Sequence, residues 1–319
     1  MSDAIIVLNA GSSSLKFSVF GVTGQPLNLI AHGQIEGIGT APRFVAKDQR
    51  GRVLADLPLQ PVPAGNASAA NHDDPRDFDH SAAFSHIAHW IRARYAAEYS
   101  PIGIGHRIVH GGAKFTAPTR IDPQVLAELE KLIPLAPLHQ PHNLAAVTAV
   151  MRSRSDLPQV ACFDTAFHQK RPKVTQRFGL PDEYFQQGIR RWGFHGLSYE
   201  SIAARLCGIA PALARGKVIV AHLGSGASLC ALRAGRCVDT TMSFSVLDGL
   251  PMGTRCGTLD PGVILYLLQQ GMTAPQLEEL LYKKSGLLGI SGDYYDPRRD
   301  IFSEKFEVVP RTIRGTAYP

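Results

Sequence analysis

The sequence predicts an α/β protein of two lobes with a cleft between them, and three observations lead to this prediction. The chain has 319 residues, whereas a single hydrophobic core rarely grows beyond about 250 residues. Segments with the alternating apolar pattern of strands are interspersed with segments whose apolar residues recur at helical spacing. One strand–turn–strand pattern also occurs in each half of the chain, which suggests that the two lobes are related.

The composition is that of a globular protein and argues against a nucleic-acid partner. Hydrophobic residues make up 45% of the chain and charged residues 19%, which are ordinary values for a folded domain. The net charge is +6, but Lys and Arg are scattered, whereas a nucleic-acid surface usually gathers them on one face. We therefore expect small-molecule partners and no nucleic acid.

The cysteines and the apolar segments predict a cytoplasmic protein. The five cysteines are odd in number and form no C-x-x-C pair, which argues against a disulfide framework and against a zinc site. No apolar run reaches the roughly 20 residues that a membrane helix needs. The N-terminus carries Asp3 and no basic residue before its short apolar run, so neither a signal peptide nor a membrane partner is expected.

The first half of the chain predicts a sheet followed by helices. The alternating segments AIIVL and LKFSVF flank a Gly-Ser turn, which predicts a hairpin, and short strands continue to about Leu57. Residues 61–80 are rich in Pro, Ala and Asp and predict a loop. Helical spacing then relates Phe84, Ile87, Ile91 and Tyr95. A second helix is expected after Asp122, a favourable N-cap followed by Pro123, and a third begins near Asn143.

A polar stretch at residues 151–158 marks the predicted boundary between the lobes. We expect an N-terminal lobe over residues 1–150 and a C-terminal lobe over residues 151–319. The apolar segment QVACF predicts the first strand after this boundary, and a helix is expected from about Ser198.

The segment VIVAHLGSGASLCAL, at residues 218–232, has the same form as IIVLNAGSSSLKFSV. Gly224 follows Gly11 by 213 positions, and the same offset pairs His222 with Asn9 and Ser225 with Ser12. This is consistent with an internal duplication, although strand–Gly–strand hairpins also arise by chance. Successive backbone N–H groups in such turns bind anions. Two turns that face each other can therefore hold a polyphosphate, whereas each alone can be an ordinary hairpin. The Walker and G-x-G-x-x-G patterns are absent.

Four glycine-containing segments carry charged or imidazole side chains, at residues 105–112, 162–169, 190–196 and 249–262. Each alone has an ordinary interpretation: a surface salt bridge for Arg107, a loop histidine for His195, a turn or helix cap for Asp164. Together they suggest a reaction. Arg107 and Arg255 can clamp a small anion, Asp164 can hold Mg²⁺, and His139 and His195 can donate to phosphoryl oxygens. The predicted reaction class is phosphoryl transfer.

Eight segments, in this order along the chain, carry a family resemblance: IIVLNAGSSSLKFSVF, GHRIVHGG, PLAPLHQPHNL, FDTAFHQ, RRWGFHGLSYE, AHLGSGASLCAL, DGLPMGTRCGTLDPG and SGLLGISGD. In these segments the chain resembles the acetate kinase family. The resemblance implies two similar actin-like (ribonuclease H-like) lobes, each a mixed β-sheet flanked by helices. It further implies reversible phosphoryl transfer from ATP to acetate, giving ADP and acetyl phosphate, with Mg²⁺ or Mn²⁺, in a homodimer.

The resemblance also implies roles for individual residues. Arg107 and Arg255 match the arginines that bind acetate and the phosphoryl group, Asp164 matches the essential aspartate, and His195 and His139 match the transition-state and positioning histidines. The apolar walls of the acetate site correspond to Val109, Leu138 and Phe194. The first phosphate loop corresponds to Asn9, which is also the metal-binding candidate, and to Ser12, Ser14 and Lys16. The second phosphate loop corresponds to His222, Leu223, Gly224, Ser225 and Gly226.

The chemistry of the acceptor agrees with a donor role for His195. A carboxylic acid with a pKa of about 4 is already ionised at neutral pH, so no general base is needed to form the nucleophile. The arginines would then hold one anion beside another and offset the charge of the transition state.

The sequence departs from the family pattern at two places. Ser225 stands where many family members have Asn. After residue 293 the family pattern ends, so we expect a second lobe that is incomplete on the nucleotide side. Two alternatives therefore accompany acetate kinase activity: a propionate or butyrate kinase, and an inactive remnant that binds only anions.

Overall fold

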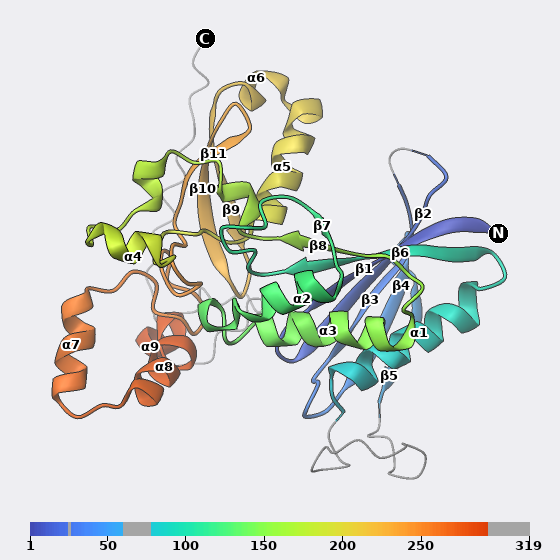
Figure 1. Cartoon of the computed structure of the whole chain (residues 1–319). Helices are drawn as coiled ribbons and strands as arrows, with labels where there is room; N and C mark the ends of the chain where they lie inside the picture. The colour runs from blue at the N-terminus through green and yellow to red at the C-terminus, as the bar shows by residue number, and fades with distance from the viewer. Residues whose placement is uncertain (25–26, 60–77, 293–319) are drawn as a thin grey trace.

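The computed structural model describes residues 1–24, 27–59 and 78–292 (Figure 1). Most of the loop expected at residues 61–80, and the tail after residue 292, lie outside this part. Two sheets make up the described strands, one of eight strands and one of three. In Figure 1 they lie in different halves of the molecule, with helices packed on each.

The large sheet has the strand order β5-β4-β3-β2-β1-β6-β8-β7. The first five strands, β1 to β5, are antiparallel neighbours, whereas β6 and β8 run parallel to β1. Their bounds are β1 (Ser2–Ala10), β2 (Ser14–Gly21), β3 (Asn28–Glu36), β4 (Arg43–Asp48), β5 (Val53–Pro58), β6 (Tyr99–Ile108), β7 (Thr119–Arg120) and β8 (Gln159–Phe163). The predicted hairpin and the strands up to Leu57 are thus confirmed.

Three helices accompany this sheet: α1 (His80–Tyr95), α2 (Pro123–Glu130) and α3 (Gln140–Ser153). Phe84, Ile87 and Ile91 of α1 are buried against the sheet, as their spacing predicted. Asp122 caps α2 by accepting a hydrogen bond from the backbone N–H of Val125 at 2.7 Å, which confirms the predicted N-cap. The third helix begins at Gln140, three residues before the expected start.

The small sheet has the order β11-β10-β9, with β9 (Lys217–Leu223), β10 (Ala227–Arg233) and β11 (Arg236–Thr240) all antiparallel. Helix α5 (Gly196–Ile209) packs on it through Tyr199 and Ala203. The remaining helices are α4 (Asp182–Gln186), α6 (Pro211–Ala214), α7 (Pro261–Gln269), α8 (Ala274–Lys283) and α9 (Gly286–Ser291), with 3₁₀ turns η1 (Ile133–Leu135), η2 (Ala166–His168) and η3 (Lys173–Gln176).

The two Gly-Ser hairpins have the same form but turns of different length. In the first hairpin Ala10 pairs with Leu15, which leaves four residues in the turn. In the second, Leu223 pairs with Ala227, which leaves three. The offset between the two hairpins is therefore 213 positions before the turn and 212 after it. As a result, Ser228 is paired with His222 in the second hairpin, as Lys16 is paired with Asn9 in the first.

Strand β8 follows the predicted lobe boundary in sequence but belongs to the first sheet. Its five residues run parallel to β6, with Ile108 opposite Phe163. The division at residue 150 stays a prediction; a division according to sheets would fall after Phe163.

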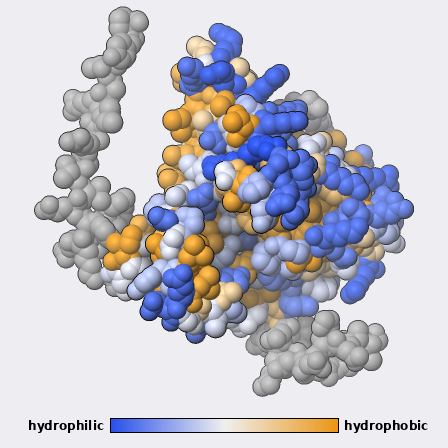
Figure 2. Space-filling model, turned by 60° about the vertical axis from the view of Figure 1, so that its left-hand side comes forward, coloured by the Kyte–Doolittle hydropathy of each residue, from blue (hydrophilic) through white to orange (hydrophobic). Residues whose placement is uncertain are grey.

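Apolar side chains reach the surface in patches (Figure 2). Exposed examples in the second half of the chain are Ile219 and Leu223 on β9 and Leu265 and Tyr266 on α7. Among the described helices, none combines the length and apolar character needed to cross a membrane.

Candidate active site

Three polar side chains meet at the carboxyl ends of β1, β6 and β8. Because these strands are parallel neighbours, Asn9, Arg107 and Asp164 emerge at the same edge of the sheet. Arg107 donates from Nη1 to Oδ1 of Asn9 at 3.1 Å, and from Nε and Nη2 to Oδ2 of Asp164 at 3.1 and 2.5 Å. The Asp164 side chain is only 2% exposed. A buried carboxylate needs such a partner, so this ion pair fixes both groups in place.

Asn143, on α3, ties together the strand ends that carry these groups. Its Nδ2 donates to the carbonyl O of Ala10 at 2.6 Å, and its Oδ1 accepts from the backbone N–H of Val109 at 2.9 Å. Ala10 ends β1 and Val109 follows β6, so one buried side chain satisfies backbone groups of both segments. Asn143 therefore sets the spacing between Asn9 and Arg107.

His195 enters the site from the start of α5 in a left-handed conformation, with φ 59° and ψ 20°. This conformation is uncommon outside glycine, and the next residue explains how it is held. The backbone N–H of Gly196 donates to the carbonyl O of Asp164 at 3.0 Å. A Cβ on Gly196 would collide with that same oxygen. The approach of the two backbones thus places His195 beside Asp164.

A chain of hydrogen bonds orients the ring of His195. Its Nδ1 lies 2.8 Å from Oγ of Ser228, which lies 2.5 Å from the hydroxyl of Tyr199. Hydroxyl groups both donate and accept hydrogen bonds. When Tyr199 donates to Ser228 and Ser228 donates to Nδ1, the proton of the neutral ring is on Nε2. Burial lowers the pKa of His195 to about 3, with His222 adding to the effect, so the ring is neutral at neutral pH.

The second Gly-Ser turn lies against this histidine. The rings of His195 and His222 stack with centroids 4.0 Å apart and an interplanar angle of 19°. A Cβ on Gly226 would lie 3.3 Å from Nε2 of His195 and 3.6 Å from Nη1 of Arg255. The turn backbone, Nε2 of His195 and the guanidinium of Arg255 therefore share one small space.

Arg255 and His139 complete the group. Arg255 donates from Nη1 to the carbonyl O of Val246 at 3.3 Å, and within residues 1–24, 27–59 and 78–292 it forms no ion pair. Burial lowers its pKa. Burial also lowers the pKa of His139 to about 4, and the charges of Arg255 and Arg107 lower it further. His139 therefore lies within the field of both arginines and is neutral at neutral pH.

A model of the acetokinase family matches residues 4–311. The chain belongs to the acetokinase family. It is 47% identical over 308 residues to an acetate kinase of Rhodopseudomonas palustris, covering 95% of this chain and 73% of that protein. It is 46% identical over 300 residues to an acetate kinase of Nitrobacter hamburgensis, covering 93% and 70%.

Solved structures of the family have the same fold. The chain matches an acetate kinase of Porphyromonas gingivalis with a TM-score of 0.75 and 35% identity, covering 93% of this chain and 72% of that one. It matches a propionate kinase of Francisella tularensis with a TM-score of 0.79 and 33% identity, covering 92% and 71%. The predicted actin-like α/β fold and the membership of a kinase family are thereby confirmed.

The acetokinase phosphate-loop candidates lie at the two hairpin turns. In the first turn Ser12 is exposed and Ser14 half-buried, and His80 bonds the carbonyl O of Gly11 through Nε2 at 2.6 Å. Lys16 is exposed opposite Asn9. In the second turn, Leu223, Gly224 and Ser225 are exposed and the backbone N–H of Gly224 donates to the carbonyl O of Gly226 at 3.1 Å. The open turns leave backbone N–H groups available to a ligand.

The predicted apolar walls are brought together only in part. Val109 and Phe194 are each 1% exposed and belong to one buried cluster with Met242, Val246 and Met252. Leu138 is half-buried next to His139 in the chain. The cluster lies directly behind Arg255, whose Nη1 also approaches Sδ of Met252 at 3.7 Å.

Sequence reasoning missed the residues that orient the others. The sequence marks Asn143 only as the start of a helix, and no motif in it indicates Ser228 or Tyr199. One signal could have indicated them: each is a polar residue at a position where the spacing of apolar residues in the strand or helix predicts a buried side chain. In the structure Asn143, Tyr199 and Ser228 are all at most 2% exposed. Buried polar groups need hydrogen-bond partners, and the partners of these three residues are groups of the candidate site.

Proposed function

We propose that the chain transfers the γ-phosphoryl group of ATP reversibly to acetate, giving ADP and acetyl phosphate. The observation that carries this proposal is that two half-buried arginines lie in the site with different surroundings. Arg107 is held by Asp164 and Asn9, whereas the guanidinium of Arg255 bonds only neutral acceptors among the described residues. A guanidinium that has no carboxylate partner is suited to an incoming anion.

The site supports direct in-line transfer with the acetate carboxylate as nucleophile. That carboxylate is ionised at neutral pH, so the reaction needs no general base. Both histidines are neutral at this pH, which suits them to donate hydrogen bonds to phosphoryl oxygens without exchanging a proton. Arg255 and Arg107 would offset the charge that spreads over the phosphoryl group in the transition state.

Asp164 and Asn9 would hold the divalent ion, Mg²⁺ or Mn²⁺. Their carboxylate and amide oxygens converge on the same guanidinium group of Arg107, and oxygen donors of these types fit such an ion. When bound, the ion neutralises phosphate charge. The two turns would hold the polyphosphate of the nucleotide through backbone N–H groups.

The first test is formation of acyl hydroxamate from acetate, ATP, Mg²⁺ and hydroxylamine. We expect activity in the wild type and a loss of about 10³-fold or more in Arg255→Ala, because a cationic donor to a transferring phosphoryl group can contribute this much. Arg233→Ala is the matched control, since Arg233 is exposed at the end of β10. Wild-type turnover in Arg255→Ala would refute the role of Arg255.

A propionate kinase is the second candidate, favoured by the match to the propionate kinase of Francisella tularensis. The acyl group would lie against Val109 and Phe194. Propionate has one methylene group more than acetate, and burying a methylene contributes about 0.8 kcal/mol. The ratio of kcat/KM for propionate to kcat/KM for acetate therefore shows whether the apolar wall has room for the additional methylene. A higher value for propionate would change the proposed acceptor.

The nucleotide and the assembly state are tested separately. We propose ATP and ADP as co-substrates and a cytoplasmic homodimer. Calorimetric titration with ADP and Mg²⁺ distinguishes a kinase from a protein that binds only anions, and light scattering on the full chain measures its mass. Absence of nucleotide binding by a folded protein would leave only the anion-binding alternative.

A further inference from the structure

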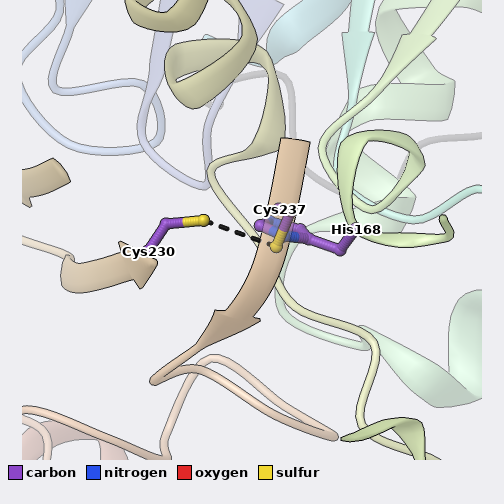
Figure 3. A group of neighbouring side chains, drawn as sticks. All are labelled: His168, Cys230 and Cys237. Carbon is purple, nitrogen blue, oxygen red and sulfur yellow. Dashed lines mark hydrogen bonds between the residues drawn. The ribbon is translucent and has the colours of Figure 1, made fainter. Parts of the chain in front are cut away.

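A compact group of two cysteines and one histidine lies outside the active site (Figure 3). Cys230 is on β10, Cys237 on the neighbouring β11 and His168 at the end of η2. The two Sγ atoms are 3.4 Å apart, and Nδ1 of His168 is 3.1 Å from Sγ of Cys237. All three ligand atoms lie within 4.8 Å of one another. The three side chains are buried, with Cys230 and His168 fully inaccessible.

The tautomer of His168 suits this group to a metal ion. Its Nε2 lies 2.9 Å from the carbonyl O of Phe194, and a carbonyl only accepts, so Nε2 carries the proton. The lone pair of Nδ1 therefore points toward the two sulfur atoms. A histidine whose far nitrogen donates to a backbone carbonyl is the usual arrangement of a metal ligand, because that hydrogen bond fixes both the ring and the tautomer.

A buried positive charge and an apolar shell surround the two cysteines. Arg171 is 4% exposed, and its positive charge interacts with both cysteines. Metal ligation takes the thiolate form. Water is kept out by the apolar cluster of Tyr199, Val220 and Leu232 that surrounds the two cysteines.

We propose that Cys230, Cys237 and His168 form a binding site for a thiophilic d¹⁰ metal ion, Cu⁺ or Zn²⁺. Two sulfur atoms that bind one ion at about 2.3 Å lie no more than about 4.6 Å apart, so the observed 3.4 Å requires only a small outward movement. Thiolate and imidazole donors select these ions over Mg²⁺, which prefers oxygen. Binding releases the thiol protons to solvent as the two metal–sulfur bonds form.

The absence of a C-x-x-C pair had argued against zinc. Six residues separate Cys230 from Cys237 in the chain. The hairpin formed by β10 and β11 brings the two side chains together, one from each strand. Three protein donors suffice for Cu⁺, whereas Zn²⁺ takes a fourth. The backbone carbonyl O of Asp239, 3.7 Å from Sγ of Cys237, is a candidate for this position.

The site is mechanically connected to the active-site loop. His168 holds the carbonyl O of Phe194, and a Cβ on Gly193 would lie 2.8 Å from the His168 ring. Arg171 donates to the carbonyl O of Trp192 at 3.0 Å. A bound ion would therefore fix the segment that leads into His195, although the site itself does not depend on the proposed reaction.

The experiment is a titration of the full, reduced chain under anaerobic conditions, in competition with a chromophoric chelator of known affinity. One arm uses Cu⁺ and the other Zn²⁺, and Co²⁺ serves as the spectroscopic probe. We expect one equivalent of ion per chain in at least one arm, thiolate-to-metal absorption with Co²⁺, and proton release. The arm with the tighter binding identifies the ion.

Matched cysteine variants locate the site. Cys237→Ser and Cys230→Ser should each weaken binding by more than about 100-fold, since even the loss of an outer hydrogen bond to a ligand costs about 10–100-fold. Cys207→Ser is the control, because Cys207 is exposed on α5, and it should bind as the wild type does. Equal loss in all three variants would overturn the assignment.

X-ray absorption at the metal edge of the wild type does not depend on how the variants fold. We expect two sulfur ligands and at least one nitrogen ligand. A coordination shell without sulfur, or no stoichiometric binding of either ion to the wild type, would overturn the proposal.

Discussion

At the scale of single residues, the candidate site depends on buried polar groups that hold other polar groups. His195 is oriented by Ser228, which is in turn oriented by Tyr199. When Ser228 donates to Nδ1, Nε2 of His195 carries the proton and donates toward the space shared with Arg255 and the second turn. A neutral donor at this position stabilises developing negative charge without a change of protonation.

We predict that Ser228→Ala lowers kcat by about 10–100-fold, because the imidazole loses the donor that selects its tautomer. KM for acetate should change little, since Arg107 and Arg255 remain. The ¹⁵N shifts of the His195 ring, measured by NMR, report the tautomer directly. Thr240→Val is a control, because Thr240 is buried in the same sheet and bonds the backbone of Leu229. An unchanged tautomer in Ser228→Ala would contradict the positioning role.

At the scale of elements, α3 acts as a brace between β1 and β6. Asn143 and Gln140 of this helix bond backbone groups at the ends of these strands. Asn143 bonds Ala10, the last residue of β1, and Val109, which follows β6. Gln140 bonds both the N–H and the carbonyl O of His110, the next residue. Neighbouring parallel strands are held together by the hydrogen bonds between their backbones. A side chain that bonds the ends of both strands therefore fixes the distance between them at the point where Asn9 and Arg107 lie.

We predict that Asn143→Ala destabilises the protein by about 2–6 kcal/mol, because it leaves two buried backbone groups without partners at about 1–3 kcal/mol each. Hydroxamate formation should fall as well, because Asn9 and Arg107 lose their fixed spacing. The control is Ser153→Ala at the exposed end of the same helix. Urea unfolding gives the stability of both variants. A stability within 0.5 kcal/mol of wild type, the scatter expected of surface substitutions, would contradict the bracing role.

At the scale of the whole molecule, neutral histidines are distributed through both lobes. Burial lowers the pKa values of His106, His110 and His139 to about 4, and that of His195 to about 3. In the unfolded chain each titrates near 6.5. The unfolded state therefore binds more protons than the folded state between about pH 3 and pH 6.5, and folding stability rises with pH across this window.

We predict that the free energy of unfolding falls by about 1 kcal/mol per buried histidine when the pH is lowered from 7.5 to 5.5. Above about pH 8 these groups should contribute almost no pH dependence, because both states are then neutral. Urea unfolding at several pH values measures this slope. His106→Gln, which keeps a hydrogen-bonding group near Gln159, should reduce it. A stability that is unchanged between these pH values would contradict the neutral assignment.

Local information in the sequence determined the secondary structure and the kinds of residue in the site. Alternation predicted β1 and β2, helical spacing predicted α1, and Asp122 with Pro123 predicted the start of α2, because each depends on neighbours within a few positions. The charged and glycine-containing segments likewise indicated Arg107, Asp164, His195 and Arg255, since anion chemistry requires particular side chains.

Only the tertiary structure decided what depends on residues far apart in the chain. Strand β8 joined the first sheet although it follows the polar stretch, because pairing with β6 is set by the sheet edge available. Asn143 reaches Ala10 across 133 positions, and His168 reaches Cys237 across 69. The sequence period shows which side chains are buried, but the partners that a buried polar group finds depend on the packing of the whole chain.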